Sequence, residues 1–176
     1  MAETNVTYIK YLLGLSRKGR KNSFLELCEL NLPRVYAICG LCLGDSKIAE
    51  LVSKDVFISA WQNLKFVRDD TSVTAWLRGI AVFEIMEELR TRERRIKAYP
   101  KEKKNDSTIY TRVHTNSQFE STILELPELE RTIFVLHDAE GYDYDEISGF
   151  FGDLSVDEIK QIIRASRAEL LGIDAQ

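Results

Sequence analysis

The sequence predicts an all-α protein of two small helical domains joined by a polar linker. Apolar residues recur at helical spacing through most of the 176 residues, and no stretch of any length alternates with the two-residue period of a strand. Helix-start signals recur as well: Asp143 precedes Glu146, and Ser155 precedes Glu158, at the spacing of a capping box. A polar stretch without apolar periodicity separates the two helical parts, and this break predicts the two-domain organisation.

The first 43 residues predict two helices. A short amphipathic helix lies within residues 1–20. We interpret it as packing on the following domain, because a membrane-surface anchor would need a longer and more basic face. A second helix covers residues 22–43, where Pro33 predicts either a kink or a new start. The apolar residues of this helix that we expect to point inward are Phe24, Leu27, Cys28, Leu32, Val35, Ile38, Cys39 and Cys42.

Gly44-Asp45 marks a break, after which two more helices are expected. Residues 46–64 predict an amphipathic helix, Phe66 to Ser72 a polar loop, and Val73 to Arg95 a long helix. The inward residues expected of the long helix are Trp76, Leu77, Ile80, Ala81, Phe83, Ile85, Met86 and Leu89. The helix ends in a basic cluster made of Arg90, Arg92, Arg94, Arg95 and Lys97.

Residues 97–117 predict a flexible linker, because they are polar and follow no helical period. As a coil this segment spans roughly 25 Å, and fully extended about 70–75 Å, so the flanking domains can dock together or separate. We therefore place an N-terminal domain at residues 1–96 and a C-terminal domain at residues 118–176.

The C-terminal domain predicts a helix-turn-helix. Pro127 suits the first position of a helix that Gly141 closes, and Gly152 ends a short second helix. The third helix runs to about Leu171, and we interpret it as the recognition helix. Its expected inward residues are Ile159, Ile162, Ile163, Ser166 and Leu170, and its outward residues are Asp157, Gln161, Arg164 and Ala168.

The net charge of −4 hides an asymmetry between the two parts of the chain. Residues 1–96 carry 15 Lys and Arg against 12 Asp and Glu, whereas residues 118–176 carry 4 against 14. The part that resembles a DNA reader is therefore the acidic one, and weak DNA binding is the physical expectation for it. Opposite charge also favours docking of the C-terminal domain on the basic face from Arg90 to Lys97.

No pattern for catalysis is present, and we expect neither enzymatic activity nor a metal or cofactor. A phosphate-binding glycine loop and a Ser/His/Asp or Cys/His set are lacking. Cys39 and Cys42 lie three residues apart on an apolar helical face, which favours small core residues over a redox pair or a zinc site. Without a signal sequence or an apolar run of membrane length, we expect a reduced, cytoplasmic protein that does not insert into a membrane.

Two blocks of sequence, in this order and spacing, resemble one family. The first block contains Ala49-Glu50, Asp55 to Trp61, Phe66, Ala75 to Ala81, Leu89-Arg90 and the arginines that follow. The second contains Leu126 to Arg131, Phe134 to Leu136, Glu140 to Tyr142, Glu146-Ile147, Ile159-Lys160 and Ser166 to Leu170. Over roughly residues 22–171 the chain resembles the extracytoplasmic-function (ECF) sigma factors of the sigma-70 family, which pair a region 2 domain with a region 4 domain.

The resemblance implies a role for each domain in transcription initiation. The region 2-like domain would bind the clamp helices of core RNA polymerase and would capture and melt the −10 element of promoter DNA. The region 4-like helix-turn-helix would contact the −35 element. The implied polymerase-binding residues are Glu50, Lys54, Asp55 and Phe57. The implied DNA-binding residues are Phe66, Arg68, Thr71, Ser72, Arg78, Arg90, Arg92, Arg94, Arg95, Lys160, Gln161, Arg164 and Arg167.

The chain departs from the family pattern at both interfaces. The family favours Asp and Gln where this chain has Leu51 and Lys54. On the recognition helix the family has a Gly-Thr-Val-Lys-Ser-Arg-Leu-like opening and then a basic pair, whereas this chain has Asp157 to Ile163 at the opening, and Ala165 replaces one of the later arginines. An alternative is therefore a sigma-like adaptor that binds a regulatory protein, such as an anti-sigma factor, without strong DNA binding. A third possibility is an acidic helical protein-interaction module. An anti-sigma factor is an expected partner in the first two interpretations.

Overall fold

The computed structural model describes residues 2–68, 70–98, 113, 115 and 117–172, and within these ranges every regular element is helical. The N-terminal elements are α1 (Ala2–Arg17), α2 (Lys21–Leu43), α3 (Ser46–Asn63), the short 3₁₀ helix η1 (Leu64–Phe66) and α4 (Val73–Ala98). The C-terminal elements are α5 (Gln118–Ile123), α6 (Glu128–Phe134), the π-helical turn η3 (Val135–Ala139), α7 (Tyr144–Phe151) and α8 (Val156–Leu170). The predicted all-α fold is confirmed.

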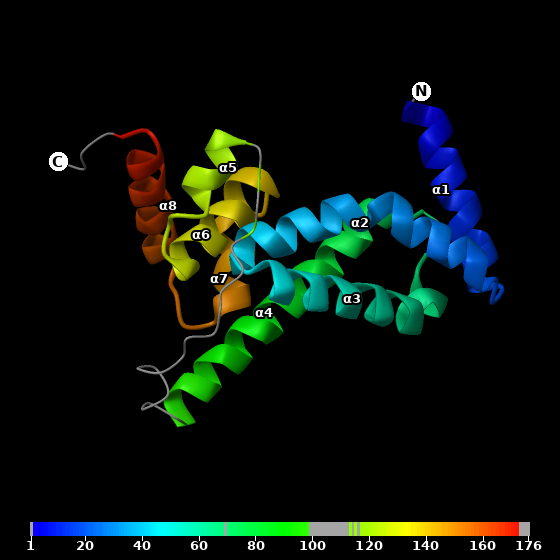
Figure 1. The fold of residues 1–176 in the computed structure, drawn as a ribbon, viewed down its shortest axis with the longest axis horizontal. Helices are drawn as coiled ribbons and strands as arrows, with labels where there is room; N and C mark the ends of the chain where they lie inside the picture. The colour runs from blue at the N-terminus through cyan, green and yellow to red at the C-terminus, as the bar shows by residue number, and fades with distance from the viewer. Residues whose placement is uncertain (1, 69, 99–112, 114, 116, 173–176) are drawn as a thin grey trace.

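The helices form an elongated molecule with a three-helix centre. Helices α2, α3 and α4 pack side by side along the long axis, α1 crosses one end of this bundle, and α5 to α8 gather at the other end (Figure 1). The two ends of the chain therefore lie at opposite ends of the molecule. Helix α4 projects beyond α3 at its C-terminal end (Figure 1).

Local capping explains where most of these helices begin. The Asp45 side chain accepts hydrogen bonds from the backbone N–H groups of Lys47 and Ile48, at 2.9 and 3.0 Å, and so starts α3. Both predicted capping boxes are present: Asp143 with Glu146 begins α7, and Ser155 with Glu158 begins α8. These starts are specified by neighbouring residues alone.

Helix α2 runs through Pro33 as one continuous element. Of the two possibilities left open by the sequence, a new helix start is therefore wrong. The expectation that Leu32 points inward is also wrong, since 45% of its surface is exposed. The buried position beside it belongs to Asn31, whose side-chain amide donates to the Leu27 carbonyl at 2.7 Å. A polar side chain can be buried there because its donor is satisfied within the helix.

Helix α4 corrects a second inward assignment. Phe83 is 60% exposed, whereas the neighbouring Val82 is buried in the core cluster. Periodicity identified the apolar side of this helix but not its edge, and Phe83 lies just outside the buried stripe. The helix also continues three residues beyond the predicted end, to Ala98.

The C-terminal part contains one helix that the sequence reading missed. Helix α5 is only six residues long, and Ser117 caps it by accepting from the Glu120 N–H at 3.3 Å. Pro127 stands as the N-cap of α6, one position before the predicted place. Gly141 follows the π-turn η3 at φ +76°, so it ends this helix as expected.

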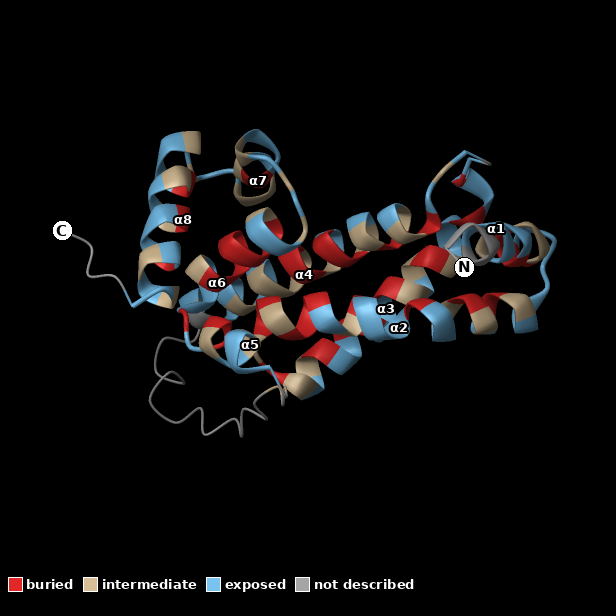
Figure 2. Ribbon diagram, turned by 90° about the horizontal axis from the view of Figure 1, so that it is seen from above, coloured by how far each residue is buried: buried red, intermediate tan, exposed pale blue. Residues whose placement is uncertain are grey.

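The buried apolar side chains of both parts form one continuous cluster. It extends from Leu12 of α1, through α2 to α4, to Ile133 of α6 and Ile159 of α8. Figure 2 shows this buried band running along the inner faces of the helices. The C-terminal part is therefore docked on the N-terminal bundle, as the charge asymmetry favoured. Most of the predicted linker lies outside the described residues, and of its described part the Val113 side chain approaches Gly40 of α2.

Candidate nucleic-acid interface

One face of α3 presents charged and apolar side chains to solvent. Glu50, Lys54 and Asp55 are exposed, and Lys54 donates to Glu50 at 2.7 Å one helical turn away. This bond lowers the pKa of the Glu50 carboxyl. Leu51 and Ile58 lie on the same face and are 58% and 54% exposed. The sequence reading missed Ile58, although its spacing of seven residues from Leu51 places both on one side of the helix.

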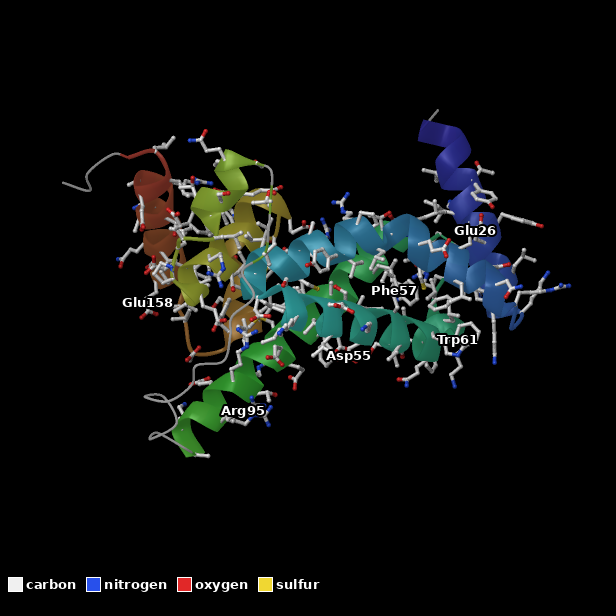
Figure 3. All side chains as sticks on the ribbon, viewed as in Figure 1. Glu26, Asp55, Phe57, Trp61, Arg95 and Glu158 are labelled. Atoms are coloured by element: carbon white, nitrogen blue, oxygen red, sulfur yellow. The ribbon has the colours of Figure 1, made fainter. Side chains whose placement is uncertain are left out.

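Phe57, the fourth residue predicted to bind polymerase, lies apart from this face. Its ring is half-buried against the core cluster, and Figure 3 shows Phe57 and Asp55 on different sides of α3. Phe57 therefore packs α3 onto the core and does not belong to the exposed face. Trp61 on the same helix packs on Phe24 of α2, with ring centroids 5.0 Å apart, so it belongs to the core as expected.

The loop between α3 and α4 carries a strongly exposed aromatic ring. Phe66 is 71% exposed, and the Lys65 ammonium lies 4.8 Å from its ring centroid. Arg68 forms a two-bond pair with Asp70, at 2.9 and 3.1 Å. Ser72 is exposed and its hydroxyl accepts from the Ala75 N–H at 3.4 Å, so it caps α4. Thr71 beside it is half-buried.

A groove between α3 and α4 opens beside aromatic residues of α4. It encloses about 380 Å³ and is lined by Trp76, Phe83, Ile80, Gly79, Ser59 and Asn63, among others. The α4 members recur at three- and four-residue spacing, so one edge of the helix forms the apolar wall. The α3 members supply polar groups on the opposite wall. Phe83 is the residue missed here, because its apolar character had placed it in the core.

Several of the arginines predicted to bind DNA lie on α4. The first three of them along the helix form hydrogen bonds with the C-terminal domain. Arg78 donates from Nη1 to the Glu140 carbonyl at 2.8 Å, and its guanidinium lies 5.2 Å from the Tyr142 ring centroid. Arg90 donates to the Phe150 carbonyl at 2.9 Å, and Arg92 donates to the Glu128 carboxylate. These contacts extend over four turns of α4.

The last arginines of α4 stay on the surface. Arg94 donates to the Arg90 carbonyl at 3.2 Å and remains exposed, as does Arg95, which lies toward the projecting end of the helix (Figure 3). Lys97 pairs with Glu93 at 2.6 Å. Docking therefore covers most of Arg92, whose side chain is 17% exposed. Arg90 contacts the C-terminal domain but stays 45% exposed, and the rest of the basic face is accessible.

Burial agrees with the predicted faces of α8 except at Ala168, which was expected to face outward and is half-buried. Ile159, Ile163 and Ser166 are buried, whereas Gln161 and Arg164 are exposed. The two flanking cations are held within the domain. Arg167 forms a two-bond pair with Asp138. Lys160 lies 3.5 Å from Asp157 and 5.6 Å from the Tyr144 ring centroid.

The described residues contain neither a group of His, Cys, Asp and Glu side chains placed to hold a metal nor a helix long and apolar enough to cross a membrane. Cys39 and Cys42 are fully buried in the core, as predicted, and Cys28 is half-buried. Burial raises the pKa of Cys28 and Cys39 to about 11, and that of Cys42 further. Arg131 is buried between the two domains, a position that no sequence pattern indicated.

Two family models match the chain in order. The model for sigma-70 region 2 matches residues 27–95, and the model for sigma-70 region 4 matches residues 117–170. Together they span more than half of the chain. They cover the three-helix bundle with its exposed loop, and the helix-turn-helix. No match among curated proteins was found.

Two solved structures share the fold over most of both chains. The sigma factor RpoE in complex with the anti-sigma factor NepR, from Bartonella quintana, is 21% identical with a TM-score of 0.57, covering 86% of this chain and 98% of that chain. CnrH in complex with the cytosolic domain of CnrY is 20% identical with a TM-score of 0.52, covering 94% and 96%. At these identities the likeness concerns the fold.

Proposed function

This chain belongs to the sigma-70 family and has the two-domain organisation of its ECF group, and we propose that it directs core RNA polymerase to promoters. The observation that carries the proposal is the presence of both a region 2 and a region 4 match in one chain, in that order. The family performs no covalent chemistry, so the function consists of binding polymerase and binding and melting DNA. Core RNA polymerase and promoter DNA are cytoplasmic, so we propose that the chain acts in the cytoplasm.

Polymerase docking is assigned to the exposed face of α3. Glu50 and Asp55 supply negative charge, and Leu51 and Ile58 supply apolar area that solvent now covers. Interfaces of this kind combine an apolar centre with a charged rim that sets orientation. The ammonium of Lys54 is partly neutralised by Glu50, so the charge difference from the family pattern at this position is reduced.

Strand opening is assigned to the α3–α4 loop and the groove beside α4. Phe66 offers an exposed ring, and Phe83 with Trp76 lines the open groove of about 380 Å³ between α3 and α4. A base can stack on such rings only after it leaves the duplex, and each stacking contact is worth about 1–3 kcal/mol. These contacts therefore favour the melted state of the −10 element. Arg94 and Arg95 would lie along phosphates of the adjoining duplex.

We assign contact with the −35 element to α8. We expect this contact to supply only a small part of the free energy of binding to promoter DNA. Gln161 and Arg164 are the exposed side chains that would reach base edges. Arg167 and Lys160 are paired with carboxylates, and the domain is acidic. We therefore expect α8 to bind the −35 element weakly, and the N-terminal domain to supply most of the free energy of binding to the promoter.

A second candidate function is that of a sigma-like adaptor that binds an anti-sigma factor without strong DNA binding. Both similar structures carry an anti-sigma factor or the cytosolic domain of a partner, and the acidic C-terminal domain favours a protein ligand. An anti-sigma factor is proposed as a partner under either candidate. Binding to core polymerase and melting of DNA distinguish the two.

The first experiment tests polymerase docking with a charge reversal on α3. Asp55→Lys is expected to weaken binding to core RNA polymerase by about tenfold or more, because it places a like charge at a complementary interface. The matched control is Glu29→Lys on the exposed side of α2, which is expected to bind as the wild type does. The affinity is measured with fluorescently labelled full-length chain. Equal affinity of the two variants would reject this docking face.

A further inference from the structure

Positive charge is concentrated on α1 and on the turn that joins it to α2. Residues 4–25 contain no Asp or Glu, and their five Lys and Arg are all exposed: Lys10, Arg17, Lys18, Arg20 and Lys21. Residues 1–96 carry 15 Lys and Arg against 12 Asp and Glu, so without these five cations the balance would be 10 against 12. The basic character of the N-terminal domain therefore comes from this segment. We call residues 17–23 the elbow.

The elbow has a fixed backbone shape. Gly19 has φ +83°, and its N–H donates to the Ser16 carbonyl at 2.9 Å. The Arg20 N–H donates to the Leu15 carbonyl at 3.2 Å. These are the two hydrogen bonds of a Schellman motif, which often has an apolar residue at the position of Arg20, packed on the preceding helix. Here this position carries an exposed arginine instead.

The stability of the two helices does not account for the basic elbow. Arg17 is favourable in the last turn of α1, because the helix dipole places partial negative charge there. The same dipole disfavours Lys21 in the first turn of α2, which contains no acidic residue and no side-chain cap. The cations that follow α1 are therefore better explained by an external anionic ligand than by helix formation.

An exposed aromatic ring lies beside these cations. Tyr11 is 61% exposed and lines a groove of about 530 Å³ together with Arg20, Lys21, Asn22 and Ser23. Single-stranded nucleic acid is bound by this combination of groups, since cations contact its phosphates and a base stacks on the ring. A lipid surface would instead be bound by a long apolar face with a basic border.

The elbow lies at the same end of the bundle as the loop that carries Phe66. Helix α1 contacts η1, whose last residue is Phe66, and Figure 1 shows the elbow and the α3–α4 loop at the end away from α5 to α8. Arg95, which we assigned to the adjoining duplex, lies toward the other end of α4 (Figure 3). A strand that leaves the duplex near Arg95 and is captured at Phe66 would therefore reach the elbow already unpaired.

We propose that Tyr11 and the elbow form a further binding site for single-stranded DNA, which takes the unpaired strand that continues beyond the base captured at Phe66. The proposal rests on the proposed melting function. It extends that function to a segment that lies before residue 27, outside the matches to both family models. Arg20 and Lys21 contact phosphates, and one base stacks on Tyr11. Both kinds of contact tolerate any base sequence.

The test compares two labelled fork-junction DNAs bound by the full chain assembled with core RNA polymerase. Both forks contain the same duplex and the same unpaired −10 segment. Only the long fork continues with about eight more unpaired nucleotides, within the usual site size of single-strand binders. The variants are Tyr11→Ala, Tyr11→Phe, which keeps the ring, and the double variant Arg20→Ala/Lys21→Ala. Fluorescence anisotropy measures affinity at several salt concentrations.

We expect Tyr11→Ala to bind the long fork about fivefold or more weakly than Tyr11→Phe, because it loses one stacking contact. The double variant is expected to lower the slope of log affinity against log salt on the long fork by about 1.4, since each contact with a single-strand phosphate contributes about 0.7. All variants are expected to bind the short fork and core polymerase as the wild type does.

The proposal is overturned if the losses are equal on the two forks, if Tyr11→Phe binds the long fork as weakly as Tyr11→Ala, or if the variants bind core polymerase more weakly. Sedimentation with vesicles of phosphatidylcholine and phosphatidylglycerol tests the lipid alternative. A double variant that loses vesicle binding but keeps its affinity for the long fork would assign the elbow to a lipid surface. A wild-type holoenzyme that binds neither fork would instead reject the proposed function on which this site rests.

Discussion

Phe66 and Phe83 illustrate how single aromatic residues carry the proposed function. Both rings are mostly exposed, at 71% and 60%, although burial of a phenyl ring stabilises a fold by about 1.5–3 kcal/mol. The fold lacks this stabilisation at Phe66, next to the α3–α4 loop, and at Phe83, beside the groove between α3 and α4. The polar surroundings of Phe66 marked it as a surface residue in the sequence. Phe83 gave no such signal, because an apolar residue at helical spacing is indistinguishable from a core residue until its neighbours are known.

The thiols predict a dependence of stability on alkaline pH. Burial raises the pKa of Cys39 from its ordinary value of 9.0 to about 11. Between these pH values the unfolded chain loses the proton and the folded chain keeps it, so the free energy of unfolding falls as pH rises. The expected slope for Cys39 is about 1.4 kcal/mol per pH unit. Urea unfolding at pH 8 to 11 measures it.

The matched control for this prediction is Cys39→Ala, which removes the titrating group while other groups titrate as before. The difference in slope between wild type and variant isolates the thiol. A fast reaction of Cys39 with a thiol reagent in the native protein at pH 8 would contradict its assignment as an inert core residue.

For individual helices, the sequence predicts well where a helix begins. It predicts poorly which residues of the helix are buried and whether a very short helix forms. A capping box depends on residues three positions apart, so Asp143 with Glu146 and Ser155 with Glu158 were recognisable without the fold. Helix α5 was missed because six residues hold too little periodicity to be recognised. Leu32 was assigned inward because the pattern could not show that Asn31 would be satisfied within α2.

The capping box of α8 supports a stability prediction. Ser155→Ala removes an acceptor for the Glu158 N–H and a donor to the Glu158 carboxylate. We expect a loss of about 1 kcal/mol in the free energy of unfolding, the usual effect of an N-cap deletion. Ser155→Asp retains an acceptor at the cap and is expected to stay near the wild type. Thermal and urea unfolding followed by circular dichroism measure both, and equal stability of the two variants would show that the cap contributes nothing.

At the scale of the whole molecule, the charge asymmetry predicted that the two domains attract each other. It also pointed to the basic face from Arg90 to Lys97, where Arg90 and Arg92 contact the C-terminal domain. It could not predict the contacts at the end of α2 or at the Glu140 carbonyl, because these depend on backbone groups of the folded chain. Arg131, which is buried between the two domains, was visible in the sequence but indistinguishable from a surface arginine. Contact of the C-terminal domain with the basic end of α4 was thus predictable from charge, whereas its contact with Arg78 was not.

Opening of promoter DNA is the activity that we propose for this chain as a sigma factor. It concerns the whole molecule, because polymerase docking, strand capture and −35 contact lie on three different helices. The loop ring Phe66 is the most direct probe, since its removal leaves the α3 face intact. Phe119 on α5 is 60% exposed and provides a matched control far from the loop in sequence.

The most direct measurement is run-off transcription with core RNA polymerase on a library of promoter fragments, together with permanganate detection of melted −10 DNA. We expect the wild type and Phe119→Ala to melt the same fragments and yield transcripts. Phe66→Ala is expected to bind core polymerase normally and to melt those fragments at least about tenfold less, which corresponds to the loss of one stacking contact. A wild type that binds core polymerase but melts none of the fragments, or a Phe66→Ala variant that melts them equally well, would contradict the account.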